Sequence, residues 1–405
     1  MKLSIRWILA IIFLVFGIIT IDLQSLKWTF LGILFFSIPL LFQFFKSNYL
    51  RYGALWFGVF MLNQTLLSSL IKGDFITLSP NLYSYVDIDG LQGIHGKQLI
   101  TTDHKGFRIT KKVDYNSNDD YNIFAIGGST TEQIDIDDKK TWTHLLQEKL
   151  TLKMKQEVTV INTGVSGLRA RHHLATLKNI IKYKPDMVIF LVGINDWNWH
   201  IKDHFNKLHG QSITKYLQNI RMQLVLNKTM LGSILRTTFY TIKKSSGSPL
   251  QFVDHYTLKN RIGSLYRESK YTFGPNDVHS QYKNMLGEIS SICNQHNIEC
   301  MFLTQPSGYQ KGATNEFKAG FWMTPPFEEY TLDFNSMVNI ASLYNKYLIN
   351  FGNDNNHSVC DLASQIKPSY DFMFDDCHFN INGALKVSEI LFSCIEANTK
   401  KQEMN

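Results

Sequence analysis

The chain has 405 residues, of which 44% are hydrophobic and 19% are charged. This composition is typical of a folded protein and excludes a disordered one. The formal net charge is +7, yet residues 1–72 hold six basic residues against one acidic residue, and the remainder holds 35 against 33. Because the excess lies among apolar N-terminal segments, it favours membrane topology over nucleic-acid binding.

Three apolar segments open the chain, at about 3–21, 28–45 and 52–71. A helix needs about 20 apolar residues to cross the hydrocarbon core of a bilayer. The first two segments meet this length well, whereas the third contains several polar residues. A cleaved signal peptide is the alternative for the first segment, but no small-residue cleavage site follows it. We expect a membrane anchor of about three transmembrane helices over residues 1–72.

The basic residues that flank these segments predict their orientation. With three spans, one side of the membrane holds Lys2, Arg6, Lys46 and Arg51, and the other side holds Lys27 and Lys72. The positive-inside rule then places the N-terminus in the cytoplasm and the rest of the chain outside it. If the third segment only lies on the membrane, the domain that follows is cytoplasmic instead.

Residues 73–120 are turn-rich, with short strand-like pieces at 99–102 and 107–110, and we expect a lead-in segment packed against the main domain. From Asn122 onward, apolar strands alternate with helical segments. Strands are predicted at 122–126, 158–162, 187–192, 299–304 and 358–362. Helices are predicted at about 141–155, 171–183, 278–295, 336–350 and 382–396.

This alternation predicts an α/β fold with a parallel sheet and right-handed crossovers over residues 121–405. The rhythm breaks at about 197–275, which is polar, basic and aromatic, and we interpret this stretch as a largely helical insertion. Within it, residues 222–244 form a lid, a helix on the membrane surface, or a packed surface helix.

The five cysteines show no Cys-x-x-Cys spacing, so no metal site is indicated, and the odd count leaves at least one of them unpaired within a monomer. One or two disulfides form if the domain lies outside the cytoplasm, and an arrangement with all thiols free is equally open. The cysteines are Cys293, Cys300, Cys360, Cys377 and Cys394.

Four short blocks carry the residue types of acyl-transfer chemistry. Three of them follow successive predicted strands, so they converge on one edge of the sheet. The fourth precedes the last predicted helix. The blocks are Gly127-Gly128-Ser129, Asn162 to Gly167, Gly193 to Asp196, and Asp375 to His378.

A serine nucleophile needs a base, and histidine titrates in the right range. The histidine in turn needs a carboxylate that holds its tautomer, and in Asp375-x-x-His378 both groups come from one turn. The oxyanion needs preorganised donors, which the N–H groups of Ser129 and Gly164 and the Asn195 amide would supply.

On these motifs the chain resembles the SGNH (GDSL-type) hydrolase family, whose four name-giving residues match Ser129, Gly164, Asn195 and His378. The first block departs from the usual Gly-Asp-Ser, because Gly128 replaces the aspartate. The resemblance covers about 120–200 and 280–398. It implies a flavodoxin-like three-layer α/β/α fold, a Ser129–His378–Asp375 triad, and an oxyanion hole of Ser129, Gly164 and Asn195.

Several alternatives stay open for single residues. Gly167 is the alternative to Gly164 as oxyanion donor, and Asp376 is the alternative to Asp375 as partner of His378. Cys377 beside the histidine suggests a thiol nucleophile, but adjacent side chains rarely face each other. His172, His173 and His200 are interpreted as surface or pocket lining, and Trp197 and Trp199 as a pocket wall or core.

The sequence therefore predicts a membrane-anchored serine esterase that acts outside the cytoplasm on an ester, including an acyl group on a carbohydrate, without metal or cofactor. The alternatives are an O-acyltransferase that modifies an envelope polysaccharide and a non-catalytic envelope assembly protein on the same fold. No nucleic-acid partner is expected, and the sequence indicates no particular protein partner.

Overall fold

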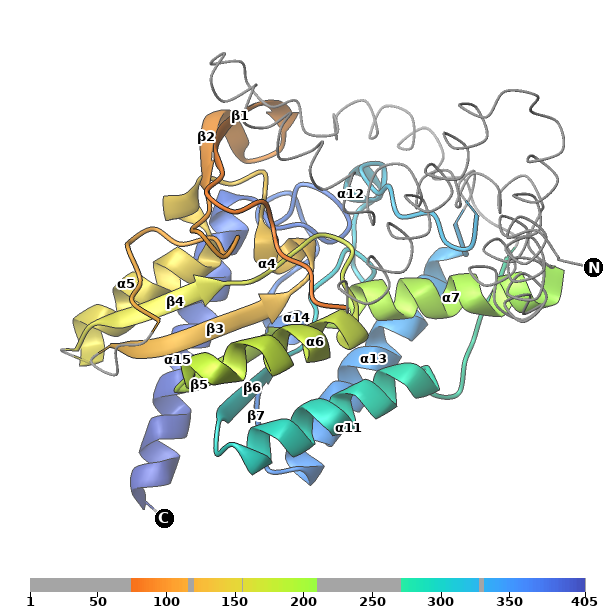
Figure 1. The fold of residues 1–405 in the computed structure, drawn as a ribbon. Helices are drawn as coiled ribbons and strands as arrows, with labels where there is room; N and C mark the ends of the chain where they lie inside the picture. The colour runs from red at the N-terminus through yellow and green to blue at the C-terminus, as the bar shows by residue number, and fades with distance from the viewer. Residues whose placement is uncertain (1–73, 116–119, 155, 210–270, 328–330, 405) are drawn as a thin grey trace, which may run out of the picture. The chain divides into compact units, whose positions relative to one another are not determined.

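The computed structural model describes residues 74–115, 120–154, 156–209, 271–327 and 331–404. In this part of the chain, five strands form a parallel sheet in the order β4-β3-β5-β6-β7 (Figure 1). Four of the strands are buried along almost their whole length, as expected when helices cover both faces of a parallel sheet, and the edge strand Ser358–Cys360 is buried only at Cys360. The strands are β3 (Tyr121–Gly127), β4 (Val158–Asn162), β5 (Met187–Leu191), β6 (Glu299–Leu303) and β7 (Ser358–Cys360).

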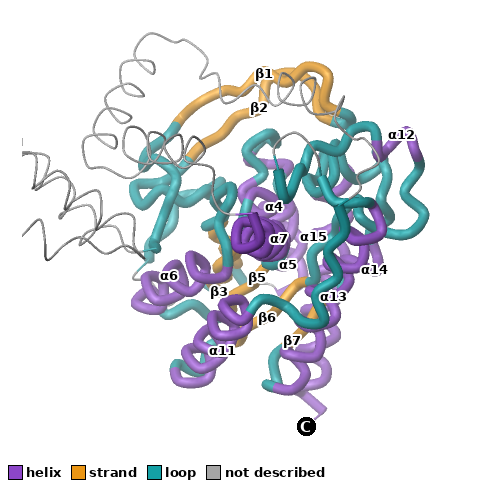
Figure 2. Tube along the Cα trace, turned by 90° about the vertical axis from the view of Figure 1, so that its right-hand side faces the viewer, coloured by secondary structure: helices purple, strands orange, loops and turns teal. Residues whose placement is uncertain are grey.

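Helices lie on both faces of this sheet, which gives three layers. Figure 2 shows the strands running between α6 and α11 on one side and α5 and α15 on the other. Tyr282 of α11 contacts Tyr344 of α13 with ring centroids 5.0 Å apart, which places α13 beside α11. The longer helices are α5 (Trp142–Met154), α6 (Ala170–Ile180), α7 (Ile194–His209), α11 (Ser280–Gln295), α13 (Phe334–Asp354) and α15 (Ile381–Met404). The short ones are α4 (Ser129–Glu132), η1 (Asp138–Lys140), η2 (Ile181–Tyr183), α12 (Asn315–Lys318) and α14 (Leu362–Gln365).

The strand order confirms the predicted α/β fold with a parallel sheet. In chain order from β3, the sheet runs second, first, third, fourth, fifth, which is the flavodoxin-like arrangement. The connections from β3 leave in one direction and those from β5 in the other, so the order reverses between these two strands. Ligands of such sheets bind at this reversal, outside the carboxyl ends of the strands. The residues directly after β3 therefore stand where a site is expected.

The lead-in agrees only in part with its prediction, because the strand-like piece at 99–102 forms the end of a longer strand. It forms an antiparallel hairpin of β1 (Tyr83–Leu91) and β2 (Ile94–Thr101). The piece at 107–110 is not a strand but makes a single bridge, from Arg108 to Asn162. Strand β1 was not predicted because its buried positions include Ser84 beside Val86 and Ile88, so its period of two is not a clean apolar–polar alternation.

The three apolar segments predicted to span the membrane, within residues 1–72, lie outside the described residues. Among the described helices, none combines the length and the apolar character that a bilayer crossing requires. Most of the expected insertion at 197–275 also lies outside the described residues. Its first residues continue α7, which begins at Ile194 within the third sequence block and runs to His209.

Four of the five cysteines form disulfides, one of the outcomes that the sequence left open. Cys293 at the end of α11 pairs with Cys300 of β6, and Cys360 of β7 pairs with Cys394 of α15. Cys377 is free and buried. Each bond ties a helix to an edge or neighbouring strand of the sheet.

Breaking the Cys360–Cys394 bond by replacing both residues with serine should destabilise the fold. The bond closes a loop with a sequence separation of 34, for which loop-closure entropy predicts a loss of about 2–4 kcal/mol. The midpoint of thermal unfolding should fall by roughly 5–10 °C. The matched control replaces Cys293 and Cys300, whose separation is 7, and should cost less. Equal stability of wild type and the first variant, measured by calorimetry, would contradict the role of this bond.

Candidate active site

The turn after β3 places Ser129 at the carboxyl edge of the sheet. Ser129 is the first residue of α4, and Gly127 and Gly128 precede it. A side chain at Gly128 would place its Cβ 2.7 Å from the Asn195 amide nitrogen, so only glycine lets the two blocks approach this closely. The aspartate that the family carries here would collide with Asn195 in this arrangement.

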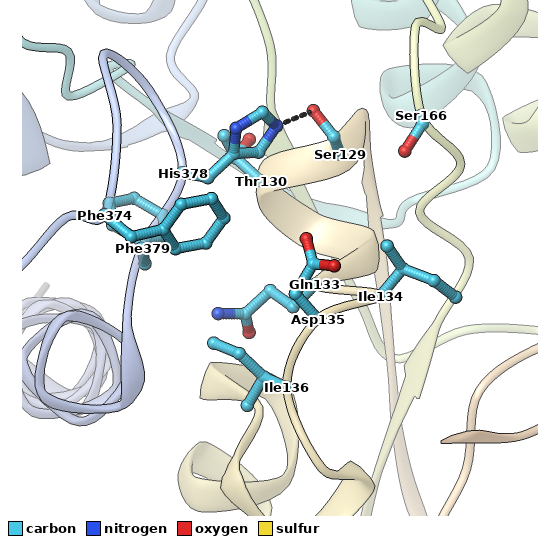
Figure 3. Close-up of a pocket in the computed structure, with 10 residues that line it drawn as sticks. All are labelled: Ser129, Thr130, Gln133, Ile134, Asp135, Ile136, Ser166, Phe374, His378 and Phe379. Atoms are coloured by element: carbon cyan, nitrogen blue, oxygen red, sulfur yellow. Dashed lines mark hydrogen bonds between the residues drawn. The ribbon is translucent and has the colours of Figure 1, made fainter. Parts of the chain in front are cut away.

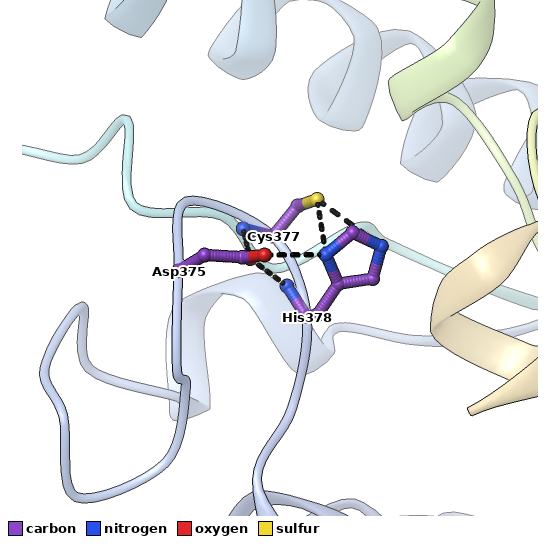
Figure 4. Close-up of side chains that lie close together, drawn as sticks. All are labelled: Asp375, Cys377 and His378. Atoms are coloured by element: carbon purple, nitrogen blue, oxygen red, sulfur yellow. Dashed lines mark hydrogen bonds and ion pairs between the residues drawn. The ribbon is translucent and has the colours of Figure 1, made fainter. Parts of the chain in front are cut away.

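Three side chains predicted as a triad form one hydrogen-bonded chain, of which Figure 3 draws the bond between Ser129 and His378 and Figure 4 the bond between His378 and Asp375. Ser129 Oγ lies 2.8 Å from His378 Nε2, and His378 Nδ1 lies 2.7 Å from Asp375 Oδ2. Asp375 Oδ1 accepts hydrogen bonds from the backbone N–H groups of Cys377 and His378, at 2.9 and 2.7 Å. The carboxylate is thus fixed by the same turn that carries the histidine, which is why Asp-x-x-His is a compact unit.

Two aromatic side chains lie close to the imidazole, with their rings nearly parallel to it. The Trp322 ring is nearly parallel to that of His378, with centroids 5.9 Å apart, and Phe374 lies 5.5 Å away on a nearly parallel plane. Trp322 Nε1 also donates a 2.8 Å hydrogen bond to Asp375 Oδ2, the oxygen that faces the imidazole. Trp322 therefore positions both members of the ion pair. The sequence did not indicate it, because it comes from an irregular stretch without periodicity.

The pair of Asp375 and His378 is electrostatically matched. Burial disfavours the imidazolium, but the charge of Asp375 and its hydrogen bond outweigh this and raise the pKa of His378 from 6.5 to about 9. For Asp375, burial acts against ionisation, but the histidine and the two backbone N–H groups hold the carboxyl pKa below its usual value. The carboxylate is therefore charged, and it stabilises the imidazolium that forms when the His378 ring accepts a proton.

Asp376 is not the partner of His378. Its Oδ2 accepts hydrogen bonds from Tyr309 Oη and the Met323 N–H, both at 2.9 Å. Burial, assisted by the charge of Asp375, raises the pKa of Asp376 to about 7. Since Met323 follows Trp322 in the chain, this buried carboxyl group fixes the segment that carries the indole.

Cys377 lies beside His378, with its Sγ 3.4 Å from Nδ1 (Figure 4). Asp375, Cys377 and His378 offer potential metal-ligand atoms within 4.8 Å of one another. Burial, followed by the charges of Asp375 and Asp376, raises the thiol pKa well above its ordinary value, so the reactive thiolate is disfavoured. The carboxylate and imidazole atoms are held by the hydrogen bonds described above, so these residues fit a proton-transfer site better than a metal site.

The expected oxyanion donors are only partly in place. The Gly164 N–H donates to Asn162 Oδ1 at 2.9 Å, and Gly164 is packed against α4. This N–H is used within its own turn, and the role of Gly164 as an oxyanion donor stays a prediction. Gly167, the alternative, has a φ of +76°, is exposed, and makes no backbone N–H hydrogen bond among the described residues. The Asn195 amide lies beside the nucleophile turn and donates to Leu168 O at 2.9 Å. Its second N–H is left for a hydrogen bond to a ligand.

A small pocket, whose empty space of about 310 Å³ includes open solvent, adjoins the serine and histidine. Its apolar walls come from isoleucine and phenylalanine side chains, and its polar groups come from α4, the loop after α4, Ser166 and His378. The lining residues are Ser129, Thr130, Gln133, Ile134, Asp135, Ile136, Ser166, Phe374, His378 and Phe379. Sequence reasoning missed the residues of 133–136, because no motif marks them.

The loop after α4 is held by a buried guanidinium from the lead-in. Arg108 is 3% exposed and donates to the carbonyl oxygens of Gln133 and Ile136 at 2.7 and 2.8 Å. It also donates to the Asp138 carboxylate, at 2.6 and 3.0 Å. Glu132, at the end of α4, accepts a 2.6 Å hydrogen bond from the Ser166 N–H. These contacts tie the lead-in, the nucleophile loop and the second block together.

The remaining candidates lie away from this pocket. His172 and His173 are buried on α6, and His200 contacts the Tyr344 hydroxyl at 3.1 Å. None of the three is among the residues that line the pocket described above. Trp197 is 1% exposed and contacts Tyr309, which makes it a core residue.

Comparison with known proteins agrees with this geometry. The model of the GDSL-like lipase/acylhydrolase family matches residues 123–391. The comparison with curated proteins gives no match.

Solved structures similar to this chain include an acetyl xylan esterase, AlAXEase, with 16% identity over 68% of this chain and 99% of that one, at a TM-score of 0.38. A psychrotrophic esterase, EstA from Pseudoalteromonas sp., has 12% identity over 69% and 99%, also at 0.38. TesA has 12% identity over 68% and 98%, again at 0.38. These scores are low, so the assignment depends on the family match, which spans well over half of the chain. The chain therefore belongs to the GDSL-like lipase/acylhydrolase family and is an ester-hydrolysing enzyme of that type.

Proposed function

We propose that the protein is a membrane-anchored serine esterase in which Ser129, His378 and Asp375 form the catalytic triad. The observation that carries this proposal is the continuous chain of hydrogen bonds from Ser129 Oγ through the imidazole to Asp375. His378 Nε2 takes the hydroxyl proton as Oγ attacks the ester carbonyl, and then delivers it to the leaving alcohol. Water, activated by the same nitrogen, hydrolyses the acyl-enzyme and regenerates the free serine.

The negative charge on the carbonyl oxygen is stabilised by the Ser129 N–H, the Gly167 N–H and the Asn195 amide. Gly167 replaces Gly164 in this assignment because the Gly164 N–H is bonded to Asn162. The exposure and positive φ of Gly167 favour a backbone N–H that points toward a ligand and not into the fold. Loss of one such donor typically costs about 100- to 1000-fold in rate.

We place the catalytic domain outside the cytoplasm, joined to about three N-terminal spans within residues 1–72. The positive-inside pattern supports this orientation. The two disulfides support it independently, because such bonds persist in oxidising compartments and are rare in the cytosol. An acylated envelope carbohydrate is the substrate class that fits such a location.

An O-acyltransferase is the second candidate function, since the same triad transfers the acyl group to a sugar hydroxyl if that hydroxyl replaces water. The test is turnover of p-nitrophenyl acetate by the full chain with and without an oligosaccharide acceptor. Release of p-nitrophenol in buffer alone, with free acetate as product, is the result expected of the esterase. Release that requires the acceptor and leaves an acetylated sugar would identify the transferase. A folded protein with neither activity would favour the non-catalytic envelope assembly protein.

The activity should rise with pH between about 6 and 9. Only the neutral imidazole accepts the serine proton, and the Asp375 carboxylate raises the pKa of His378 to about 9. Below this pKa, kcat/KM should increase about tenfold per pH unit and then level off. Measuring kcat/KM across this range, after subtracting spontaneous hydrolysis, checks the prediction. A profile that is flat from pH 7 to 9 would contradict His378 as the base with a raised pKa.

A further inference from the structure

The pocket beside the triad has an unsatisfied hydrogen-bond donor. Gln133 is 6% exposed and lines the pocket. Its Oε1 accepts a 2.8 Å hydrogen bond from the Trp142 N–H at the start of α5, and this bond fixes which end of the amide is oxygen. Its Nε2 is buried and has no hydrogen-bond partner among the described residues. Leaving a buried amide donor without a partner is destabilising, so a ligand oxygen that accepts from it would remove this cost.

This donor is rigidly placed. Gln133 has a φ of +50°, and its backbone N–H donates to Ser129 O at 2.8 Å. Its carbonyl oxygen accepts from Arg108 at 2.7 Å. Together with the bond to Trp142, these contacts fix the backbone and the amide plane. The Nε2 group is therefore preorganised, and no reorganisation is needed when a ligand oxygen meets it.

A carboxylate lies in the same pocket. Asp135 is 7% exposed, and Figure 3 shows its carboxylate turned toward Ser129 and His378, while the Gln133 amide points toward the side where Phe379 lies. Burial lowers the pKa of His378, and Asp375 raises it most strongly. The charge of Asp135 raises the same pKa further, which agrees with the closeness of this carboxylate to the imidazole. The pocket thus offers one fixed donor and one charged acceptor.

We propose that Gln133 and Asp135 form a subsite for hydroxyl groups of the substrate, next to the ester bond that Ser129 cleaves. This inference rests on the proposed esterase function. A hydroxyl group can accept as well as donate a hydrogen bond, so hydroxyl groups of one substrate serve both the Gln133 Nε2 donor and the Asp135 carboxylate. An ammonium group would leave the Gln133 donor unpaired, and a carboxylate would be repelled by Asp135.

The apolar walls complete the specificity. Ile134, Ile136 and Phe379 line the pocket beside the two polar groups. A polyol or sugar ring presents hydroxyl groups at its edge and C–H groups on its faces, which matches this mixture. A long saturated acyl chain offers no acceptor to the Gln133 Nε2 donor and would remove the Asp135 carboxylate from water. A polyol ester is therefore favoured over a simple lipid ester.

This subsite is tested on the full chain with pairs of esters, in which one member carries hydroxyl groups in its alcohol or acyl part and the other lacks them. Glycerol monoacetate is compared with propyl acetate, and ethyl lactate with ethyl propionate. The kcat/KM ratio within at least one pair should favour the hydroxylated ester by about tenfold or more. Preference in the first pair places the hydroxyl in the alcohol, and preference in the second places it in the acyl group. Either preference supports the subsite.

The variant Gln133→Glu keeps an oxygen for the Trp142 N–H but removes the donor, and should lower the favoured ratio about tenfold. Asp135→Asn, which removes the charged acceptor, should lower it similarly and serves if the first variant does not fold. Gln147→Glu is the matched control, because Gln147 Oε1 accepts from the Val160 N–H at 3.0 Å outside the pocket. This control should keep the wild-type ratio.

Two failures are distinguishable. Ratios near one in the wild type, or unchanged ratios in both pocket variants, would overturn the hydroxyl subsite if turnover still depends on Ser129. A preference for ethyl alaninate over ethyl lactate would also overturn it, in favour of an ammonium subsite. Turnover of every ester that is insensitive to Ser129→Ala would instead reject the proposed catalytic function.

Discussion

Replacing Ser129 with alanine should lower kcat on p-nitrophenyl acetate by about 10⁴- to 10⁶-fold. The variant removes the oxygen that lies 2.8 Å from His378 Nε2, so no acyl-enzyme can form. No other nucleophile in the described site can replace it, because burial and two neighbouring carboxyl groups keep the Cys377 thiol protonated. The measurement is steady-state release of p-nitrophenol, combined with mass spectrometry for an acetylated serine in the wild type.

The control for this variant is Ser393→Ala. Ser393 is an exposed serine of α15 whose Oγ donates to Glu389 O, away from the site. It should keep wild-type kcat. If Ser129→Ala is folded by circular dichroism and retains most of the wild-type turnover, Ser129 is not the nucleophile.

The second large effect is expected for Asp375→Asn, which should lower kcat by about 10⁴-fold. Every oxygen of this carboxylate accepts hydrogen bonds: Oδ1 from two backbone N–H groups, and Oδ2 from Trp322 and His378. An asparagine must turn its NH₂ group toward one of these donor pairs. Facing the imidazole, it would force the proton onto Nε2, where the ring can no longer accept from Ser129.

The same variant should change the pH dependence of the residual activity. Without the carboxylate, the imidazolium loses the interaction that raises its pKa to about 9, and burial then lowers the pKa. The rising limb of kcat against pH should therefore move to lower pH in Asp375→Asn. A simple structural defect would reduce kcat without moving this limb.

Asp376→Asn is the matched control for Asp375. Burial and the charge of Asp375 raise the pKa of Asp376 to about 7, so much of this group is already uncharged near neutrality. Its hydrogen bonds go to Tyr309 and Met323 and not to the imidazole. A loss of no more than about tenfold is expected, through a shift of the Trp322 segment. A larger loss here than in Asp375→Asn would reverse the assignment of the histidine partner.

The sheet could be predicted from the sequence because its strands are buried on both faces. Such strands form continuous apolar runs, and the run predicted at 187–192 covers β5. The pairing of Asp375 with His378 could also be predicted, since one turn holds both residues. These two features depend on near neighbours in the chain, where spacing determines geometry.

The choice between Gly164 and Gly167 could not be predicted. Both glycines lie in one loop and look alike in the sequence. What separates them is the Asn162 side chain, which accepts from the Gly164 N–H. The positions of Trp322 and Gln133 at the site could not be predicted from the sequence either. Trp322 is placed by contacts with residues more than 50 positions away, and Gln133 by a left-handed backbone conformation that no motif marks.

The buried guanidinium of Arg108 limits how far the chain can be shortened from its N-terminal side. The arginine lies upstream of β3, outside residues 123–391 matched by the family model. Yet its side chain supplies the hydrogen bonds that hold the loop carrying Gln133 and Asp138. A shortened version that starts at residue 121 would leave these buried acceptors without their donor. A shortened chain that keeps this loop in place must therefore include Arg108 and begin upstream of the residues matched by the family model. Without Arg108, the pocket beside the triad should lose its structure before the triad does.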